Sequence, residues 1–253
     1  MFMFTPAERA TIRSQLLERA ASDQHITGAA ITGSTAAGSE DRWSDVDLAF
    51  GVMDAPAVQS TLADWTSYLY ETHHAIHHVD VPSGAWIYRV FLLPGTLQVD
   101  PAFVPAPEFR ALAPSFKLIH GTARESRYMQ PPSPEALAGM GWLYAVHART
   151  AIARAQSWQA EYMISGMRGC ALAMACVRHG LPAAHARGAD RLQDEVLARF
   201  AGTLVRCVDA NELTRAFHAA LDTLLMEIKR VSEDLHLRLD ETCRMLKDSL
   251  RTG

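Results

Sequence analysis

The sequence contains few cysteines and no long apolar segment. All four cysteines lie in the second half, and no two of them have C-x-x-C spacing, so they indicate reduced, mostly buried residues. No apolar run reaches the roughly 18 residues that a membrane-spanning helix needs. The first residues also lack the basic region and apolar core of a signal peptide. We therefore expect a cytoplasmic protein that does not interact with membranes.

Basic residues are scarce in the first half of the chain. Residues 1–120 contain 7 Lys/Arg and 13 Asp/Glu, whereas residues 121–253 contain 17 and 15. Affinity for nucleic acid depends largely on Lys and Arg contacts with phosphate groups, so this acidic half disfavours a nucleic-acid partner.

Length and composition are those of a folded protein with one large domain or two ordinary ones. The 253 residues are 49% hydrophobic and 21% charged. A polar, proline-rich segment at 121–134 separates a half with mixed patterns from a half with mainly helical ones. We predict an α+β protein. Residues 1–125 would form a domain with a mixed β-sheet flanked by helices, and residues 126–253 an α-helical bundle.

Local signals predict the elements of the first half. Thr5, Pro6 and Glu8 form a helix start with a capping box, and apolar residues then recur at helical spacing. The Pro94-Gly95 turn predicts a hairpin of the strands on its two sides. The patterns predict helices at 5–21 and 56–71, and strands at 25–32, 44–52, 75–81, 86–93, 96–104 and 116–120.

Helical patterns occupy most of the second half. Ser133 follows Pro131-Pro132 and is placed to cap a helix, and His179-Gly180 followed by Pro182 indicates a helix end. We predict helices near 134–157, 159–180, 191–206, 210–232 and 233–250.

The most informative motif is Gly33-Ser34, followed after ten residues by Asp45-Val-Asp47. Residues i and i+2 of a strand point to one face, so the two carboxylates would project together, about 7 Å apart along the chain. Adjacent carboxylates repel each other unless a cation lies between them, and Mg²⁺ suits carboxylate and phosphate oxygens. Backbone N–H groups of the Gly-Ser turn could contact phosphate. The motif therefore predicts chemistry on a nucleoside triphosphate.

A third acid, Asp100, stands inside an apolar strand, where an unpaired charge is costly. If this strand lies beside the one with Asp45 and Asp47, three carboxylates converge. Three carboxylates are sufficient to hold two divalent ions for attack on a phosphoryl group. The alternative is a strand-end acid in water.

These residues together resemble the signature of the DNA polymerase β-like nucleotidyltransferase superfamily. The match covers roughly residues 5–120, and the mixed sheet followed by helices is similar to the small-molecule branch, the aminoglycoside and lincosamide nucleotidyltransferases. The resemblance implies an N-terminal nucleotidyltransferase domain and a C-terminal domain that binds the acceptor.

The resemblance also implies roles for individual residues. Gly33 and Ser34 would hold the triphosphate, Asp45 and Asp47 would ligate two Mg²⁺ ions, and Asp100 would ligate the ion that activates the acceptor hydroxyl. A nucleoside monophosphate, with ATP as the expected donor, would pass to a hydroxyl of a small molecule, for example an antibiotic, and pyrophosphate would leave.

Three further assignments have open alternatives. Glu161 is a candidate general base or ligand for an acceptor ammonium group, or an ordinary acid at a helix start; Asp100 could be the base instead. Arg42 and Ser44 lie in the segment expected to border the phosphate site. The Ser44 hydroxyl could support that site. Arg42 could reach the phosphates or remain a solvated loop arginine.

Other functions remain open from the sequence alone. A protein with the same fold could be regulatory, such as an antitoxin-type partner, although the helical second half makes this chain longer than minimal antitoxins. Transfer to a protein or a tRNA is another alternative, and the acidic first half argues against tRNA. The sequence leaves a homodimer open.

Overall fold

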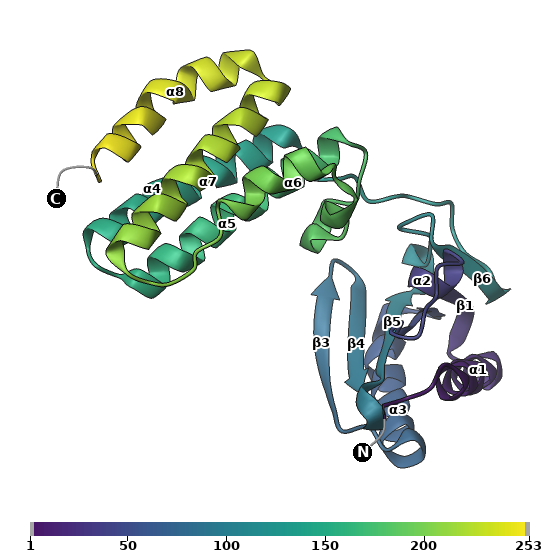
Figure 1. Ribbon diagram of the computed structural model, residues 1–253. Helices are drawn as coiled ribbons and strands as arrows, with labels where there is room; N and C mark the ends of the chain where they lie inside the picture. Colours follow the sequence, from purple (N-terminus) through teal and green to yellow (C-terminus); the bar gives the residue numbers. More distant parts are fainter. Residues whose placement is uncertain (1–2, 251–253) are drawn as a thin grey trace. The chain divides into compact units, whose positions relative to one another are not determined.

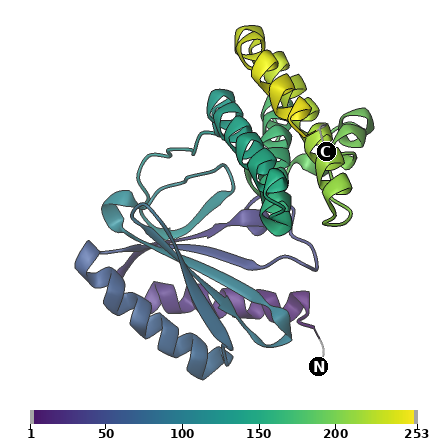
Figure 2. The same cartoon turned by 90° about the vertical axis from the view of Figure 1, so that its left-hand side faces the viewer.

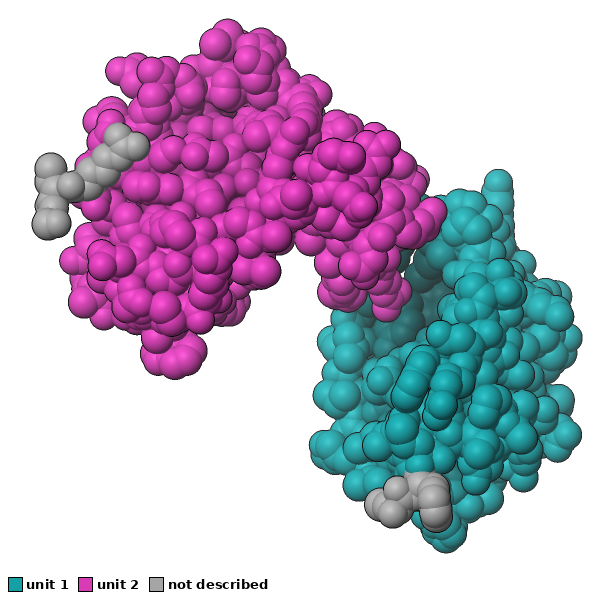
Figure 3. Space-filling view, viewed as in Figure 1, with its two compact units in different colours: residues 1–129 teal, residues 130–253 magenta. Residues whose placement is uncertain are grey.

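A computed structural model describes residues 3–250, which form two compact units. Unit 1 extends to Met129 and unit 2 begins at Gln130, as coloured in Figure 3. Unit 1 is a mixed sheet with helices and unit 2 is helical, so the predicted α+β class is confirmed. Each unit is described separately below.

The sheet of unit 1 has six strands in the order β3-β4-β5-β2-β1-β6 (Figure 1). β2 and β5 pair in parallel and the other neighbours pair antiparallel, which makes the sheet mixed. The predicted hairpin at Pro94-Gly95 is present as β4–β5. The strands are β1 (Ile26–Thr32), β2 (Val46–Val52), β3 (His77–Ser83), β4 (Trp86–Leu92), β5 (Gln98–Pro105) and β6 (Phe116–Gly121).

Two long helices cover one face of this sheet, α1 (Pro6–Ser22) and α3 (Ala55–His73), the purple and blue helices in Figure 2. The predicted capping box is formed, because the Thr5 hydroxyl accepts from the Glu8 N–H while the Glu8 carboxylate accepts from the Thr5 N–H. α3 begins after Asp54, whose carboxylate accepts from the Ala57 N–H. Both helices therefore start at side-chain caps.

Side chains of the central strands alternate between the two faces of the sheet, and the two faces pack into different clusters. On β2, Val46, Leu48 and Phe50 join the core beneath α1 and α3. The intervening residue Ala49 belongs to a smaller cluster on the opposite face, together with Ala102 of β5. Because side chains alternate across a strand, Asp47 lies on this second face.

The segment predicted as a linker is partly tied to unit 1. The N–H groups of Arg124, Arg127 and Met129 donate to the carbonyls of Phe109, Ala111 and Leu112. These backbone bonds hold the chain to the end of the sheet domain, so the compact unit extends to residue 129. The proline-rich residues that follow lead into the helix capped by Ser133.

Unit 2 is built on the packed helices α4, α5 and α7. α4 ends before the predicted residue 157, because Ala155 takes a left-handed φ of 53° and Ser157 starts the next helix. In residues 3–250 no helix is both long and apolar enough to span a bilayer. The helices are α4 (Pro134–Ala153), α5 (Ser157–Arg178), α6 (Asp194–Ala201), α7 (Ala210–Val231) and α8 (Glu233–Asp248).

Candidate active site

Three carboxylates meet where β2 and β5 run side by side. The parallel register places Asp47 directly opposite Asp100, and Asp45 immediately precedes β2. One carboxylate oxygen from each residue lies within 4.8 Å of the others. Within residues 3–250 this acidic triad is the one group of three or more acidic, histidine or cysteine side chains with such spacing. The strand adjacency on which the sequence argument depended is present.

The carboxylate of Asp100 is largely buried and only partly hydrogen-bonded. Its Oδ2 accepts a 2.8 Å hydrogen bond from the Gln98 amide, whereas its Oδ1 is buried without a partner. The pKa of Asp100 is raised to about 6, chiefly by burial and to a smaller extent by the charge of Asp45, while the Gln98 hydrogen bond lowers it. A buried carboxylate oxygen without a donor is costly, and this one belongs to a residue whose carboxylate lies close to two other acids.

Gly33 follows β1 at the start of the short helix α2 (Gly33–Ala36) and makes room for the acidic triad. Its φ of 61° is left-handed, and a Cβ built on it would lie 1.8 Å from Oδ2 of Asp47. Both the backbone conformation and the contact therefore require glycine at this position. The Gly-Ser turn and the second aspartate of the motif are in direct van der Waals contact.

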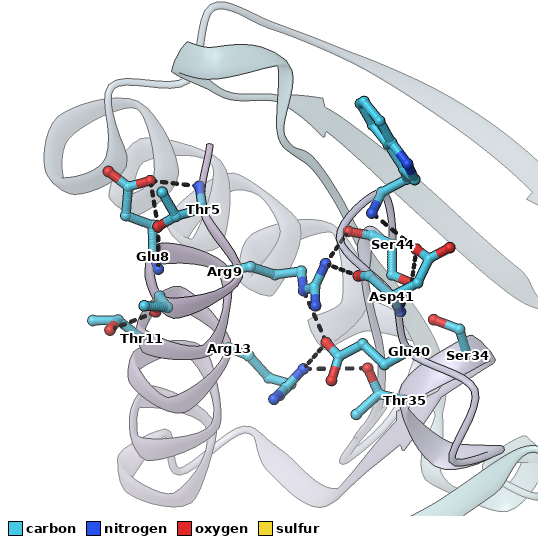
Figure 4. Close-up of polar contacts among 12 residues, drawn as sticks. Thr5, Glu8, Arg9, Thr11, Arg13, Ser34, Thr35, Glu40, Asp41 and Ser44 are labelled. Carbon is cyan, nitrogen blue, oxygen red and sulfur yellow. Dashed lines mark hydrogen bonds and ion pairs between the residues drawn. The ribbon is translucent and has the colours of Figure 1, made fainter. Parts of the chain in front are cut away.

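Ser34 presents a buried hydroxyl that lacks a hydrogen-bond partner. It lies in α2, and Figure 4 shows its side chain close to the 40–44 segment with no bond to the other residues drawn. Buried hydroxyls are normally paired, so an unpaired one beside an acidic cluster indicates a place for a ligand or water.

The donor set fits a hard divalent cation. The acidic triad supplies only carboxylate oxygens, and Asp100 also has a buried carboxylate oxygen without a hydrogen-bond partner. Mg²⁺ prefers such ligands, and a bound cation favours the charged form of a carboxylate that burial and the charge of Asp45 disfavour. The residues therefore suit Mg²⁺ or Mn²⁺.

The segment 40–44 forms a tight turn in front of Asp45. The Ser44 hydroxyl donates to Oδ1 of Asp41 and accepts from the Asp41 N–H, so it supports the turn. Arg42 is exposed, and its guanidinium lies 4.4 Å from the ring centre of Trp43. Both positions border the acidic triad in sequence, and their contact with phosphate stays a prediction.

Glu161 lies in the second turn of α5 in unit 2. Its Oε1 accepts a 2.8 Å hydrogen bond from the Ser165 hydroxyl, which also accepts from Arg168. Burial lowers the pKa of Arg168, and the Glu161 charge opposes this effect. Glu161 is thus held in a polar chain on one helix face, and its catalytic role stays a prediction from the sequence.

Sequence reasoning missed three residues that surround the turn, Arg9, Arg13 and Glu40. Both arginines lie on α1 and form ion pairs with Glu40. The i, i+4 spacing of two arginines on a helix with an apolar stripe was the available signal, because such residues share one face. Nothing in the sequence indicated that this face meets the segment before Asp45.

Comparisons with known proteins assign neither a family nor a function to this chain. No family model and no curated protein matches this chain. Among solved structures, it is similar to an aminoglycoside 6-adenyltransferase from Bacillus subtilis, with 14% sequence identity and a TM-score of 0.44. That match covers 97% of this chain and 98% of the other. Similarity at this level assigns no function, so the arguments below rest on the residues of this chain.

Replacing Gly33 by alanine tests the contact with Asp47, and Gly38 offers a matched control. Both glycines have left-handed φ angles, 61° and 69°, but a Cβ at Gly38 meets nothing within 4 Å. Each substitution should destabilise the fold by about 1 kcal/mol through backbone strain. Only Gly33→Ala should displace Asp47 and weaken Mn²⁺ binding, by about tenfold or more in calorimetric titration. Equal Mn²⁺ affinities in the two variants would contradict this contact.

The raised pKa of Asp100 predicts a pH-dependent stability. The folded protein holds this proton up to about pH 6, above the ordinary value of 3.8. Stability of the metal-free protein therefore falls as pH rises between these values and stays lower above them. In EDTA, Asp100→Asn should gain on the order of 2 kcal/mol at pH 7.5 and little at pH 3.5, as measured by chemical denaturation. An equal loss of stability at both pH values would contradict electrostatic strain at Asp100.

Proposed function

We propose that this protein is a magnesium-dependent nucleotidyltransferase. It would transfer a nucleoside monophosphate from a nucleoside triphosphate, with ATP as the expected donor, to a hydroxyl of a small molecule. The α-phosphorus forms a bond to the acceptor oxygen, its bond to the bridging oxygen of the β-phosphate breaks, and pyrophosphate leaves. The observation that carries this proposal is the convergence of Asp45, Asp47 and Asp100 beside the Gly33-Ser34 turn.

In this proposal the carboxylates of the acidic triad would hold two Mg²⁺ ions. When bound, the ions would supply charge neutralisation for the transferred phosphoryl group and the leaving pyrophosphate. The backbone pairing of Asp47 with Asp100 on neighbouring strands fixes the positions of their carboxylates. Ligands on rigid strands need no reorganisation during the reaction, so positioning and electrostatics supply most of the rate enhancement.

The Gly33-Ser34 turn is assigned to the triphosphate. The absence of a side chain at Gly33 allows the backbone to approach Asp47 closely, and the unpaired Ser34 hydroxyl is available to donate to a phosphate oxygen. Arg42 adds a positive charge on the same short segment as Ser44. These groups would orient the donor rather than react with it.

Two carboxylates are candidates to accept the proton of the acceptor hydroxyl. Asp100 is one candidate, because its carboxylate belongs to the acidic triad that would hold the metal ions. Glu161 of unit 2 is assigned instead to the acceptor, as a base or as a partner for an ammonium group. Its neighbours Trp158 and Tyr162 have 77% and 65% of their surfaces exposed, large aromatic areas suited to packing against a ring.

The decisive experiment combines a donor panel with an acceptor panel. The protein is incubated with Mg²⁺, each nucleoside triphosphate, and aminoglycosides, lincosamides, candidate proteins or tRNA, and pyrophosphate and acceptor mass are measured. We expect one small molecule to gain the mass of one nucleoside monophosphate. Asp47→Asn should lower kcat by about a hundredfold or more, because it removes a ligand from the acidic triad.

The matched control is Asp64→Asn, which neutralises an exposed acid on α3 and should leave activity unchanged. Glu161→Gln should lower turnover of the acceptor without changing Mn²⁺ affinity. Nucleotide binding without transfer to any acceptor would overturn the enzymatic proposal in favour of a regulatory protein. Modification of a protein or of tRNA would overturn the small-molecule acceptor.

A further inference from the structure

We propose that Arg9 is a positioning residue that holds Asp45 in the acidic triad by clamping the 40–44 segment onto α1. The inference rests on the proposed function only for its catalytic consequence, since metal binding tests it directly. Arg9, Glu40 and Arg13 are called the arginine clamp below. None of them touches the reacting groups.

The Arg9 side chain reaches from α1 to both ends of the 40–44 turn (Figure 4). One terminal nitrogen donates to the carbonyl of Asp41 at 2.6 Å and to the carbonyl of Ser44 at 2.9 Å. Ser44 is the residue before Asp45, so the second bond fixes the peptide that leads into the acidic triad. Arg9 has 3% of its surface exposed, which makes it one of the few buried charged residues among residues 3–250.

Glu40 compensates the buried positive charge of Arg9 and also pairs with Arg13. Its Oε1 lies 2.8 Å from Nε of Arg9, as an ion pair, and accepts a 2.6 Å hydrogen bond from Arg13. Burial alone would raise the pKa of Glu40, but the Arg13 hydrogen bond and the charges of both arginines outweigh it, so its pKa lies below its usual value. Glu40 is therefore a carboxylate throughout the neutral range.

Arg13 extends the arginine clamp to the phosphate side of the site. Its terminal nitrogen also donates to the Thr35 hydroxyl at 3.2 Å, and Thr35 lies in α2 two residues after Gly33. The same ion-pair network thus contacts Thr35, the residue directly after the Gly33-Ser34 turn, and the segment before Asp45. Both contacts come from arginines of one helix, α1.

An arginine is needed because one side chain must hydrogen-bond two carbonyls and form an ion pair with a carboxylate. A planar guanidinium can donate to two carbonyls while its Nε faces a carboxylate, whereas a lysine ammonium is a compact point charge. A buried cation that loses its partners is strongly destabilising, so the clamp favours one conformation of the turn. Residues that orient metal ligands typically change metal affinity by about 10- to 100-fold when altered.

The test uses Arg9→Lys in the full chain, with Mn²⁺ alone as the probe. We expect the Kd for Mn²⁺ to rise about tenfold, and the Mg²⁺ concentration for half-maximal activity to rise in parallel while kcat at saturating Mg²⁺ is largely kept. Glu40→Gln is the milder second variant and should shift both quantities in the same direction.

Arg19→Lys is the matched control on the same helix. Arg19 packs over Tyr68 at 4.2 Å and donates to the Asp64 carbonyl, so it contacts α3, and this variant should lower stability without changing the Kd for Mn²⁺. A folded Arg9→Lys protein and a folded Glu40→Gln protein that both bind Mn²⁺ like the wild type would overturn the positioning role alone. A wild-type protein that binds no Mn²⁺ would overturn this inference together with the proposed function.

Discussion

The in-register parallel pairing of β2 with β5 is the constraint on which the candidate site depends. It places Asp47 opposite Asp100, with Asp45 two residues earlier on the same face, and so gathers three negative charges within 4.8 Å. A shift of one residue would turn the acids of one strand into the core and break the group apart. The apolar residues of the opposite face, beneath α1 and α3, fix this register.

The surrounding structure holds the three carboxylates together despite their mutual repulsion. Phe50 of β2 and Phe103 of β5 pack against each other in the core on the opposite face of the sheet, with ring centres 5.3 Å apart. Gly33 leaves space for the Asp47 carboxylate, and Arg9 holds the turn that precedes Asp45. A site that is electrostatically unfavourable without its ligand is typical of functional positions, where local strain serves binding rather than stability.

Much of this arrangement could be predicted from the sequence because its signals are local. The capping box at Thr5, the i, i+2 spacing of Asp45 and Asp47, and the turn at Pro94-Gly95 each depend on a few adjacent residues. The pairing of β2 with β5 is non-local, so it could only be stated as a condition for the convergence of Asp100 with the other two acids. The arginine clamp was missed because ion pairs between α1 and a turn more than twenty residues later leave no periodic pattern. The role of Glu161 depends on contacts with an acceptor, which neither local patterns nor the structure of unit 2 supplies.

The most direct test of the account is a crystal structure of the protein with Mn²⁺ and a non-hydrolysable nucleoside triphosphate analogue. Anomalous scattering locates the ions independently of any assumed chemistry. The account predicts manganese peaks coordinated by carboxylate oxygens of Asp45, Asp47 and Asp100, with the triphosphate against Gly33 and Ser34. Manganese at another site, or nucleotide bound away from the acidic triad, would contradict it.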